Sequence, residues 1–328
     1  MGKIAIGIEG TAHSIGVGLI DNDGKILVNK IKMYHPAEGG IHPREAANHH
    51  AQNIVPLLEE AITAAGISYK DIELVAFSQG PGLGPCLRTA ATTARAFALT
   101  LNKPIIGVNH CVAHLEIGRI TGATDPILLY VSGGNTQVIA FVNGKYRVFG
   151  ETLDIGIGNM LDKFGRVVGL SFPAGSSIED LAKRSPQTFI ELPYSVKGMD
   201  MSFSGVLTAS ERMFKNGTSV NDLCYSIQET TFAMLAEVTE RAMAHTEKEE
   251  VLLGGGVACN KRLQAMVSDM AKARAAKFFV PSKGLCIDNG VMIAWLGLLM
   301  HDAGVTMEIK DTYVRQRFRT DEVDVSWR

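Results

Sequence analysis

The chain has 328 residues, of which 46% are hydrophobic and 20% charged, a composition typical of a folded globular protein of about two domains. Its 32 basic and 34 acidic residues give a formal net charge of −2, so any contact with nucleic acid must come from local basic patches. No run approaches the roughly 20 apolar residues of a membrane span, and the N-terminus lacks a signal-peptide pattern. The five cysteines are scattered without a CxxC pair, so we expect reduced thiols in a cytoplasmic protein that does not contact membranes.

The first predicted elements are strands near residues 3–9, 14–21 and 25–32. Glycine turns alternate with β-branched runs in this region, and Asp23-Gly24 in the second turn is a strong hairpin signal. A helix is expected over 44–65, kinked or restarted at Pro56. The next expected elements are a strand within 71–82, a helix over 85–102 and a strand over 104–110.

The same order of elements recurs from residue 125 onward. Residues 125–151 again predict three strands, with the Gly133-Gly134 turn in the place of Gly10 and an Asn143-Gly144 hairpin. Beyond a helical region, the predicted elements are a long helix near 221–246, a strand over 250–256, a helix from about 260, a strand over 276–280 and a helix near 288–303.

This repeat predicts an α/β protein built from two duplicated lobes, with a ligand cleft between them. We expect lobe I to span 1–120, with residues 300–328 returning to it, and lobe II to span 121–299. The alternative is a pair of unrelated α/β domains whose hairpins are similar by chance.

Three glycine-rich turns, at residues 8–14, 131–137 and 252–260, each follow an apolar strand. Glycine lets the backbone approach a ligand closely and point its N–H groups at an anion, and the third turn also opens a helix. Together the turns favour a nucleotide site. None matches GxxxxGK[ST] or a GxGxxG that opens the helix of a βαβ unit, which argues against P-loop enzymes and dinucleotide-dependent dehydrogenases.

The segment 156–184 places polar side chains between glycines. A carboxylate such as Asp162 or Glu179 can accept hydrogen bonds from ribose hydroxyls, and Lys163 is a further polar candidate. The alternative is that these side chains are solvated helix charges.

A histidine pair, His110 and His114, has the spacing that puts both imidazoles on one helix face. The metallopeptidase motif H-E-x-x-H needs a glutamate directly after the first histidine, where this chain has Cys111, and the nearest acid, Glu116, lies beyond the pair. Asp288, at the start of an apolar helix, offers a third ligand for an open metal site. Three interpretations of the histidine pair therefore remain: a metal site with free coordination positions, a peptidase site, and two packed histidines without a ligand.

Seven segments together resemble one known family, the universal tRNA threonylcarbamoyladenosine synthases. They are "GIEGTAHS", "GPGLGPCLR", "VNHCVAHLEIG", "LYVSGGNTQ", "LDKFGRVVGL", "LLGGGVACN" and "CIDNGVMIAW", in order along the whole chain. "EGTAHS" and "VRQRFRTDEVDVSW" resemble the archaeal and eukaryotic branch, whose members are catalytic subunits of the KEOPS complex. The resemblance implies the fold of the actin, heat-shock-ATPase and sugar-kinase superfamily, which agrees with the duplicated lobes.

The resemblance also implies a reaction and its partners. The threonylcarbamoyl group of threonylcarbamoyl-adenylate moves to the exocyclic amine of the adenosine just after the anticodon, in tRNAs that read codons starting with A, and AMP leaves. The implied partners are tRNA, a small atypical protein kinase and a small dimerising subunit. The superfamily also allows an ATPase or phosphotransferase, and a metallopeptidase is the third reading.

The residues that match the family's motifs fall into three groups. The implied ligands of one divalent metal ion per subunit, iron or zinc, are His110, His114 and Asp288, with Tyr130 close to the metal. The implied contacts to the phosphate and acyl part of the nucleotide are Tyr130, Val131, Ser132, Gly133 and Gly134, and the implied nucleoside contacts are Asp162, Gly175, Glu179 and Asn260. The backbone amides of the Ser132-Gly133-Gly134 turn are expected to stabilise developing negative charge. The basic candidates for tRNA phosphates are Arg88, Arg95, Arg315, Arg317 and Arg319, and no residue is identified as a general base.

Overall fold

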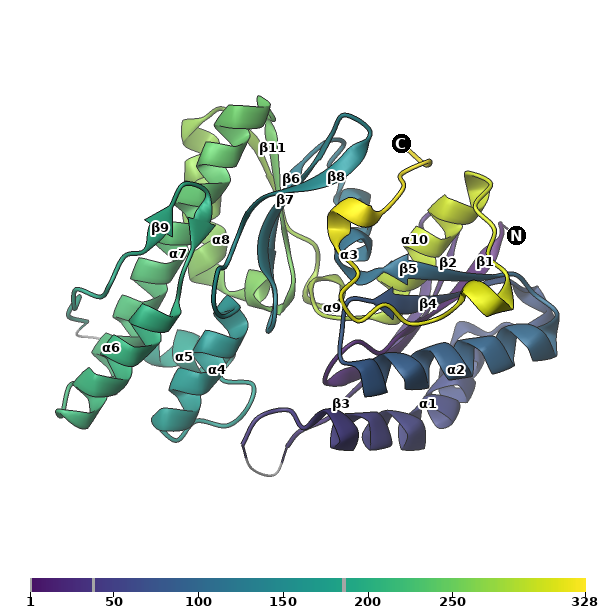
Figure 1. Ribbon diagram of the computed structural model, residues 1–328, viewed down its shortest axis with the longest axis horizontal. Coiled ribbons are helices and arrows are strands. Elements are labelled where there is room, and N and C mark those ends of the chain that lie inside the picture. The colour runs from purple at the N-terminus through teal and green to yellow at the C-terminus, as the bar shows by residue number, and fades with distance from the viewer. Residues whose placement is uncertain (1, 37–38, 185–186) are drawn as a thin grey trace. The chain divides into compact units, whose positions relative to one another are not determined.

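A computed structural model describes residues 2–36, 39–184 and 187–328. The chain divides into two compact units (Figure 1). Unit 1 comprises Met1–Ile120, Gly144–Tyr146 and Asp288–Arg328, and unit 2 comprises Thr121–Asn143 and Arg147–Ile287. No helix in the described ranges combines the length and apolar character needed to cross a membrane.

Unit 1 is built on a five-stranded mixed sheet in the order β3-β2-β1-β4-β5. Its strands are β1 (Ile4–Glu9), β2 (Ser14–Asp21), β3 (Ile26–Met33), β4 (Ile72–Gly80) and β5 (Ile105–Asn109). The first three form the predicted antiparallel meander, while β4 lies parallel to β1 and β5 parallel to β4. The carboxyl ends of three parallel strands therefore share one edge of the sheet.

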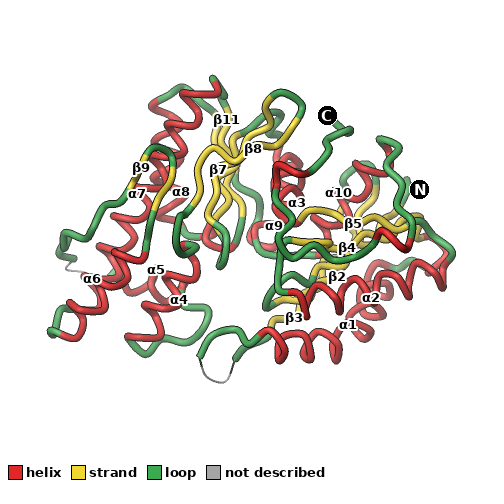
Figure 2. Tube along the Cα trace, in the orientation of Figure 1, coloured by secondary structure: helices red, strands yellow, loops and turns green. Residues whose placement is uncertain are grey.

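Helices cover both faces of this sheet (Figure 2). They are α1 (Pro43–Ala65), α2 (Gly84–Leu101), α3 (His110–Gly118) and α10 (Gly290–Asp302), with short 3-10 helices η1 (Tyr69–Asp71), η2 (Arg119–Thr121), η4 (Ile309–Asp311) and η5 (Thr320–Glu322). Of the two predicted effects of Pro56, a restart of the helix is excluded, since α1 runs through that residue, and a kink stays a prediction. The buried face of α1 is continuous on both sides of it, from His50 to Ile62, and this packing holds the helix together.

The alternation of side chains along β1 determines which helices it contacts. Ile4, Ile6 and Ile8 join one core cluster with α1 and α2. On the opposite face Gly7 lies directly under α10, where an added Cβ would come 2.1 Å from the Gly290 carbonyl oxygen. Because α10 rests on this strand, it belongs to unit 1, whereas the sequence prediction had extended the second lobe to residue 299.

Unit 2 repeats the architecture of unit 1. Its sheet has the strand order β12-β11-β6-β7-β8. Read from β8 to β12, this order matches β3-β2-β1-β4-β5 in unit 1, with the antiparallel meander first and the two later strands after it. The strands are β6 (Ile127–Val131), β7 (Thr136–Val142), β8 (Lys145–Glu151), β11 (Glu250–Gly254) and β12 (Lys277–Phe279), with a separate small hairpin of β9 (Val196–Lys197) and β10 (Asp200–Met201). Asn143 (φ 53°) and Gly144 (φ 77°) form the predicted hairpin turn. The predicted duplicated α/β fold is confirmed.

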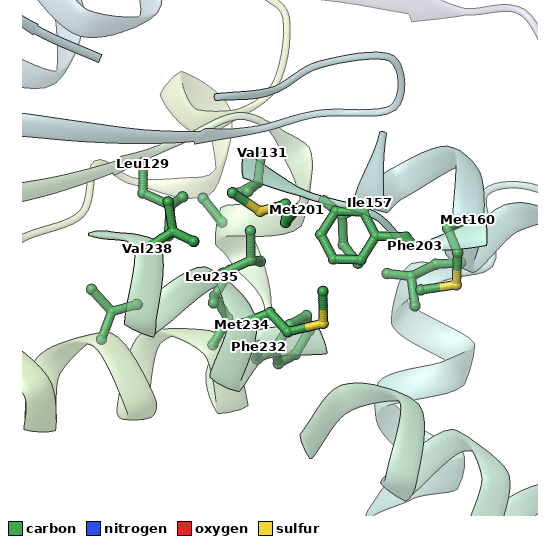
Figure 3. Packing of buried hydrophobic residues seen from close by; sticks show 14 of the residues in the cluster. Leu129, Val131, Ile157, Met160, Met201, Phe203, Phe232, Met234, Leu235 and Val238 are labelled. Carbon is green, nitrogen blue, oxygen red and sulfur yellow. The ribbon is translucent and has the colours of Figure 1, made fainter. Parts of the chain in front are cut away.

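The long helix α7 organises the core of unit 2 (Figure 3). Its side chains Phe232, Met234, Leu235 and Val238 are fully buried in one cluster with the strands and the shorter helices. The helices are α4 (Ile157–Val167), α5 (Gly175–Ala182), α6 (Ser204–Lys215), α7 (Val220–Thr246), η3 (Gly256–Cys259), α8 (Lys261–Ala273) and α9 (Lys283–Cys286).

Candidate functional site

Helix α3 carries the histidine pair and begins directly at the end of β5. Its N-cap is Asn109, whose Oδ1 accepts from the backbone N–H groups of Cys111 (3.0 Å) and Val112 (3.2 Å). Every residue of α3 is buried. The helix is therefore held in one position at the carboxyl edge of the sheet, and His110 is its first residue.

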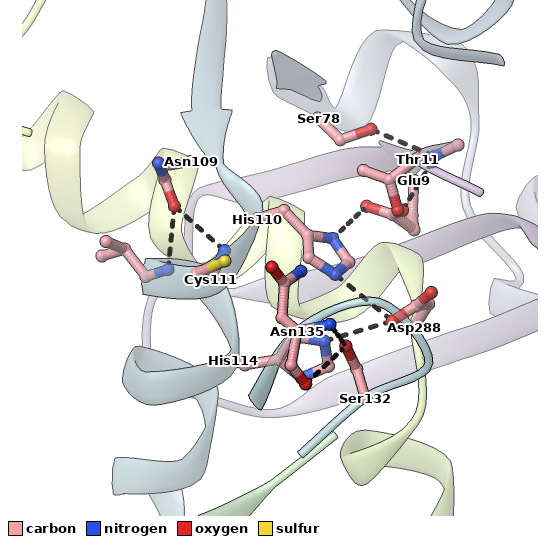
Figure 4. Close-up of polar contacts among 12 residues, drawn as sticks. Glu9, Thr11, Ser78, Asn109, His110, Cys111, His114, Ser132, Asn135 and Asp288 are labelled. Carbon is pink, nitrogen blue, oxygen red and sulfur yellow. Dashed lines mark hydrogen bonds and ion pairs between the residues drawn. The ribbon is translucent and has the colours of Figure 1, made fainter. Parts of the chain in front are cut away.

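Three potential ligand atoms lie together in unit 1 (Figure 4). Asp288 Oδ1 is 3.3 Å from His110 Nε2 and 3.2 Å from His114 Nε2, and one ligand atom from each residue falls within 4.8 Å of the others. Two ligands at about 2.1 Å from one ion lie about 3.0 Å apart in octahedral and about 3.4 Å apart in tetrahedral geometry. The two separations from Asp288 Oδ1 fall between these values, so Asp288 can share a divalent ion with either histidine, and the grouping of all three ligand atoms favours one common ion. Two imidazoles and a carboxylate suit zinc or ferrous iron.

The electrostatic setting favours an ionised Asp288 and a neutral His114. Burial would raise the pKa of the Asp288 carboxyl, but the charge and hydrogen bond of His110 and the contact with His114 outweigh burial and hold the pKa well below its usual range. Burial lowers the pKa of His114, which favours the neutral imidazole. An ionised carboxylate and a neutral imidazole are the forms that bind a metal.

A fourth polar residue, Glu9, meets the histidine pair from the end of β1. Its Oε2 lies 3.1 Å from His110 Nδ1, and its Oε1 accepts from the backbone N–H (2.8 Å) and the hydroxyl (2.5 Å) of Thr11. Glu9 is fully buried. Glu9 was not among the predicted site residues, although a charged side chain at the end of an apolar strand, just before a glycine turn, is a signal that could have indicated it.

Glu116, the acidic residue that follows the histidine pair, forms hydrogen bonds and an ion pair away from the three metal ligands. Its carboxylate accepts from the Tyr146 hydroxyl and from Trp327 Nε1 (3.0 Å), and it forms an ion pair with Arg119 (2.8 Å). It is fully buried. Because these donors occupy both of its oxygens, Glu116 cannot serve as the general base that a peptidase needs.

The glycine turn after β6 is built around Ser132 and Asn135. The Ser132 N–H donates to the Asn135 carbonyl (2.8 Å), so the expectation that this amide is available to a ligand was wrong. The carbonyls of Ser132 and Gly133 accept from Gly158 (3.1 Å) and Asn159 (2.9 Å) at the start of α4. Tyr130, which precedes the turn, is 1% exposed, and Val131 is fully buried.

The four predicted nucleoside contacts lie in unit 2 around the first turns of α5 and α8. Asp162 Oδ1 accepts from Ala174 N (2.7 Å), directly before Gly175 at the start of α5. Glu179 Oε1 accepts from the backbone N–H of Lys261 (3.1 Å). Asn260 caps α8, and its Nδ2 donates to Gln228 Oε1 (2.6 Å). These bonds orient the side chains, and their role toward a nucleoside stays a prediction.

Comparison with known proteins identifies the family. Residues 25–295 match the family described as tRNA N6-adenosine threonylcarbamoyltransferase. The chain belongs to this family. The predicted resemblance is thereby confirmed, and the family is one of transferases that act in tRNA threonylcarbamoyladenosine modification.

Two archaeal relatives illustrate the match. The tRNA N6-adenosine threonylcarbamoyltransferase of Thermococcus sibiricus is 57% identical over 325 residues, which cover 99% of this chain and 100% of the relative. The probable bifunctional tRNA threonylcarbamoyladenosine biosynthesis protein of Methanobrevibacter smithii is 58% identical, and the chain spans 60% of its length.

Solved structures support the predicted actin-like fold. HypF from T. kodakarensis aligns with a TM-score of 0.64 at 15% identity, over 90% of this chain and 47% of that protein. The activator of the 2-hydroxyisocaproyl-CoA dehydratase from Clostridium difficile aligns with a TM-score of 0.58 at 11% identity, over 93% of this chain and 99% of that protein. At these identities the likeness concerns the fold alone.

The five arginines predicted to contact tRNA differ from one another in their exposure and in their ion pairs. Arg88 and Arg317 are exposed. Arg95 instead donates from Nε to the Thr312 hydroxyl (2.6 Å) and so binds the C-terminal segment to α2. Arg315 pairs with Glu322 (2.5 Å) and Arg319 with Asp321 (3.0 Å). Arg95 is therefore a structural residue in unit 1.

Proposed function

We propose that this chain transfers the threonylcarbamoyl group of threonylcarbamoyl-adenylate to the exocyclic amine of the adenosine immediately 3′ of the anticodon, in tRNAs that read ANN codons. The observation that supports this proposal is the convergence of His110, His114 and Asp288 on one point, in a chain that belongs to a threonylcarbamoyltransferase family. The chain acts in the cytoplasm as the catalytic subunit of a KEOPS-type complex, with a small atypical protein kinase and a small dimerising subunit as partners.

The transfer is an acyl substitution at a mixed anhydride. The adenine amine attacks the carbamoyl carbon, a new C–N bond forms, the bond to the phosphate oxygen breaks, AMP leaves with the electron pair, and the amine releases one proton. An exocyclic adenine amine is a poor nucleophile, so the positioning of both substrates supplies much of the rate. The target base lies in an anticodon loop and can be splayed out without opening a duplex.

Three groups of residues bind different parts of the adenylate. His110, His114 and Asp288 hold one divalent ion, iron or zinc, which when bound polarises the acyl carbonyl or holds the threonyl carboxylate and phosphate oxygens. The phosphate and acyl part meets residues 130–134, where the Gly133 and Gly134 amides face the developing negative charge. The nucleoside meets the residues that surround the starts of α5 and α8.

The first prediction concerns the metal ligands. Purified wild-type protein is expected to contain about one equivalent of iron or zinc, and His110→Ala, His114→Ala and Asp288→Asn are expected to lose it. Loss of outer-shell partners typically costs about 10- to 100-fold, so loss of a direct ligand should lower threonylcarbamoyl transfer by more than about 100-fold. Metal content is measured by mass spectrometry, and transfer is measured by nucleoside analysis of tRNA incubated with threonylcarbamoyl-adenylate and the partner subunits.

The matched control is His245→Ala, which removes an exposed histidine from α7 in unit 2. It should keep both metal and activity. Wild-type metal content in the three ligand variants would disprove the ligand assignment. A reconstituted wild-type mixture that forms no modified nucleoside, while the protein alone hydrolyses ATP or cleaves peptides, would disprove the proposed reaction.

A further inference from the structure

The position of Glu9 on β1 brings a buried carboxylate to the metal centre. Side chains alternate along the strand, so Glu9 lies on the same face as Ala5 and Gly7, which is the face covered by α10. It has no exposed surface. Its Oε2 lies 3.1 Å from His110 Nδ1, while His110 Nε2 on the other side of the ring faces Asp288 Oδ1 at 3.3 Å.

A neutral imidazole has one N–H donor and one acceptor nitrogen, and the partner of one nitrogen determines the state of the other. A histidine that binds a metal through Nε2 must carry its proton on Nδ1. An ionised carboxylate has only acceptors, so Glu9 is the partner that this tautomer of His110 requires. With an ion bound, Glu9 Oε2 would accept the proton of His110 Nδ1, and Asp288 Oδ1 would bind the metal. Both carboxylate oxygens beside the His110 ring would then have a partner.

Hydrogen bonds from Thr11 hold the carboxylate of Glu9 in one orientation. Its Oε1 accepts two hydrogen bonds from Thr11, from the backbone N–H (2.8 Å) and from the hydroxyl (2.5 Å). The Gly10 N–H between these residues donates to the Ser78 hydroxyl on β4 (3.0 Å), which anchors the turn to the sheet (Figure 4). Only Oε2 is therefore directed at His110, and its direction is set by the fold.

We propose that Glu9 is a positioning residue of the metal centre, which holds His110 in the Nδ1–H tautomer and turns its Nε2 toward Asp288. This inference rests on the metal site of the proposed function and assigns that site an outer-shell carboxylate. Thr11 acts through Glu9, because its two donors determine which carboxylate oxygen is left for the imidazole. Partners of this kind typically change metal affinity by about 10- to 100-fold.

The most informative variant is Glu9→Gln, which keeps the size of the side chain. The Thr11 backbone N–H can only donate, so it selects the glutamine oxygen for the Oε1 position and turns the amide NH2 group toward His110. An NH2 group donates to Nδ1 and thereby favours the Nε2–H tautomer, which cannot bind a metal through Nε2. The substitution should therefore invert the His110 tautomer without removing any atom that touches the ion.

Two measurements test the inference on the full chain. Nitrogen-15 NMR of the Zn²⁺-loaded protein should show a proton on His110 Nδ1 in the wild type, and Glu9→Gln should lose this signal or the bound ion. Titration with Zn²⁺ against a competing chelator should give a dissociation constant about 10- to 100-fold weaker in Glu9→Gln. The matched control is Glu250→Gln in unit 2, a buried glutamate that also accepts backbone N–H bonds, from Thr124 (2.7 Å) and Asp125 (2.9 Å), and it should leave Zn²⁺ affinity unchanged.

Thr11→Val gives a second variant that keeps the carboxylate and removes only the hydroxyl bond, and it should weaken Zn²⁺ binding by about threefold to tenfold. A Glu9→Gln protein with the wild-type tautomer and wild-type Zn²⁺ affinity overturns this inference and leaves the proposed function intact. A wild-type protein that binds no Zn²⁺ and no Fe²⁺ overturns both.

Discussion

At the scale of single residues, Cys259 differs from the other cysteines in the acidity of its thiol. The interaction with the Cys286 side chain, together with the nearby charges of Lys283 and Lys261, outweighs burial and lowers the Cys259 pKa to about 7. Burial instead raises the pKa of Cys86 and Cys111 to about 11 and that of Cys224 to about 12. All five cysteines are free thiols, as predicted.

Cys259 is therefore expected to react first with iodoacetamide at pH 7, since the thiolate is the reactive form. Peptide mass spectrometry over a time course should show carboxamidomethylation of Cys259 at least about 100-fold faster than that of the buried Cys86 and Cys224. Cys286→Ala removes this interaction and should slow the reaction at Cys259. Equal labelling rates at all sites would contradict the expected acidity.

His50 is a buried residue whose protonation opposes folding. Burial lowers its pKa to about 4, against the partly opposing effect of its bond to the Ala12 carbonyl (3.0 Å) and with a contribution from His49. Between pH 6.5 and about 4 the unfolded chain binds more protons at this position than the native state. Stability should therefore fall as the pH falls through this range.

We expect His50 to contribute a loss of about 2 kcal/mol between pH 7.5 and 5.0. Urea unfolding followed by tryptophan fluorescence measures this in unit 1, because both tryptophans, Trp295 and Trp327, belong to that unit. His50→Gln should show a pH dependence smaller by that amount. An identical pH dependence in wild type and variant would rule out the assignment to His50.

At the scale of elements, Asn109 joins the start of α3 to the C-terminal segment. Its Oδ1 caps the helix, and its Nδ2 donates to the carbonyls of Phe318 (3.0 Å) and Arg319 (3.4 Å), more than 200 residues away in the sequence. The side chain is 2% exposed. Because His110 is the next residue, the geometry of the cap also sets the position of the first metal ligand.

Asn109→Ala should destabilise unit 1 by about 1 to 3 kcal/mol, from the lost cap and the unpaired buried carbonyls. It should also weaken Zn²⁺ binding, which is measured by the same chelator competition. Ser219→Ala removes a cap of α7 in unit 2, where Ser219 accepts from Asp222 N (3.4 Å), and serves as the control that costs about 1 kcal/mol and leaves Zn²⁺ affinity unchanged. If the two variants affect Zn²⁺ binding equally, Asn109 does not position the metal helix.

At the scale of the whole molecule, the chain end is bound to the metal helix through Glu116. Trp327 Nε1 donates to its Oε1 (3.0 Å), and Arg328, only 7% exposed in its side chain, lies 3.4 Å from the same oxygen. Arg119 and Tyr146 complete the surroundings of this fully buried carboxylate. The C-terminal segment is thereby an integral part of unit 1.

Glu116→Ala should destabilise unit 1 by about 3 kcal/mol or more, because it removes a buried carboxylate and leaves part-buried arginine and tryptophan donors without this acceptor. The emission of Trp327 should shift to longer wavelength as the segment detaches. Glu237→Ala breaks the half-exposed pair with Arg241 in unit 2 and should cost less than about 1 kcal/mol. A Glu116→Ala variant as stable as Glu237→Ala would show that the segment does not need this anchor.

The class and the outline of this protein could be predicted from local patterns in the chain. Strand alternation, glycine turns and the Asn-Gly hairpin are local signals, so the two meanders, the duplicated α/β order and the family were all accessible from short windows. The approach of Asp288 to His114, 174 residues apart, was predicted from the metal positions that a histidine pair leaves empty and from the family's motifs.

The residues that surround the metal ligands could not be predicted and emerged from the folded structure. Glu9 reaches His110 across 101 residues, and nothing in the spacing of either residue indicates the contact. The same holds for the assignment of α10 to unit 1, which depends on the close approach that Gly7 permits, and for the Ser132 amide, which the Asn135 carbonyl occupies. Periodicity and turn chemistry act within a few residues, whereas these contacts result from how the packed elements bring distant side chains together.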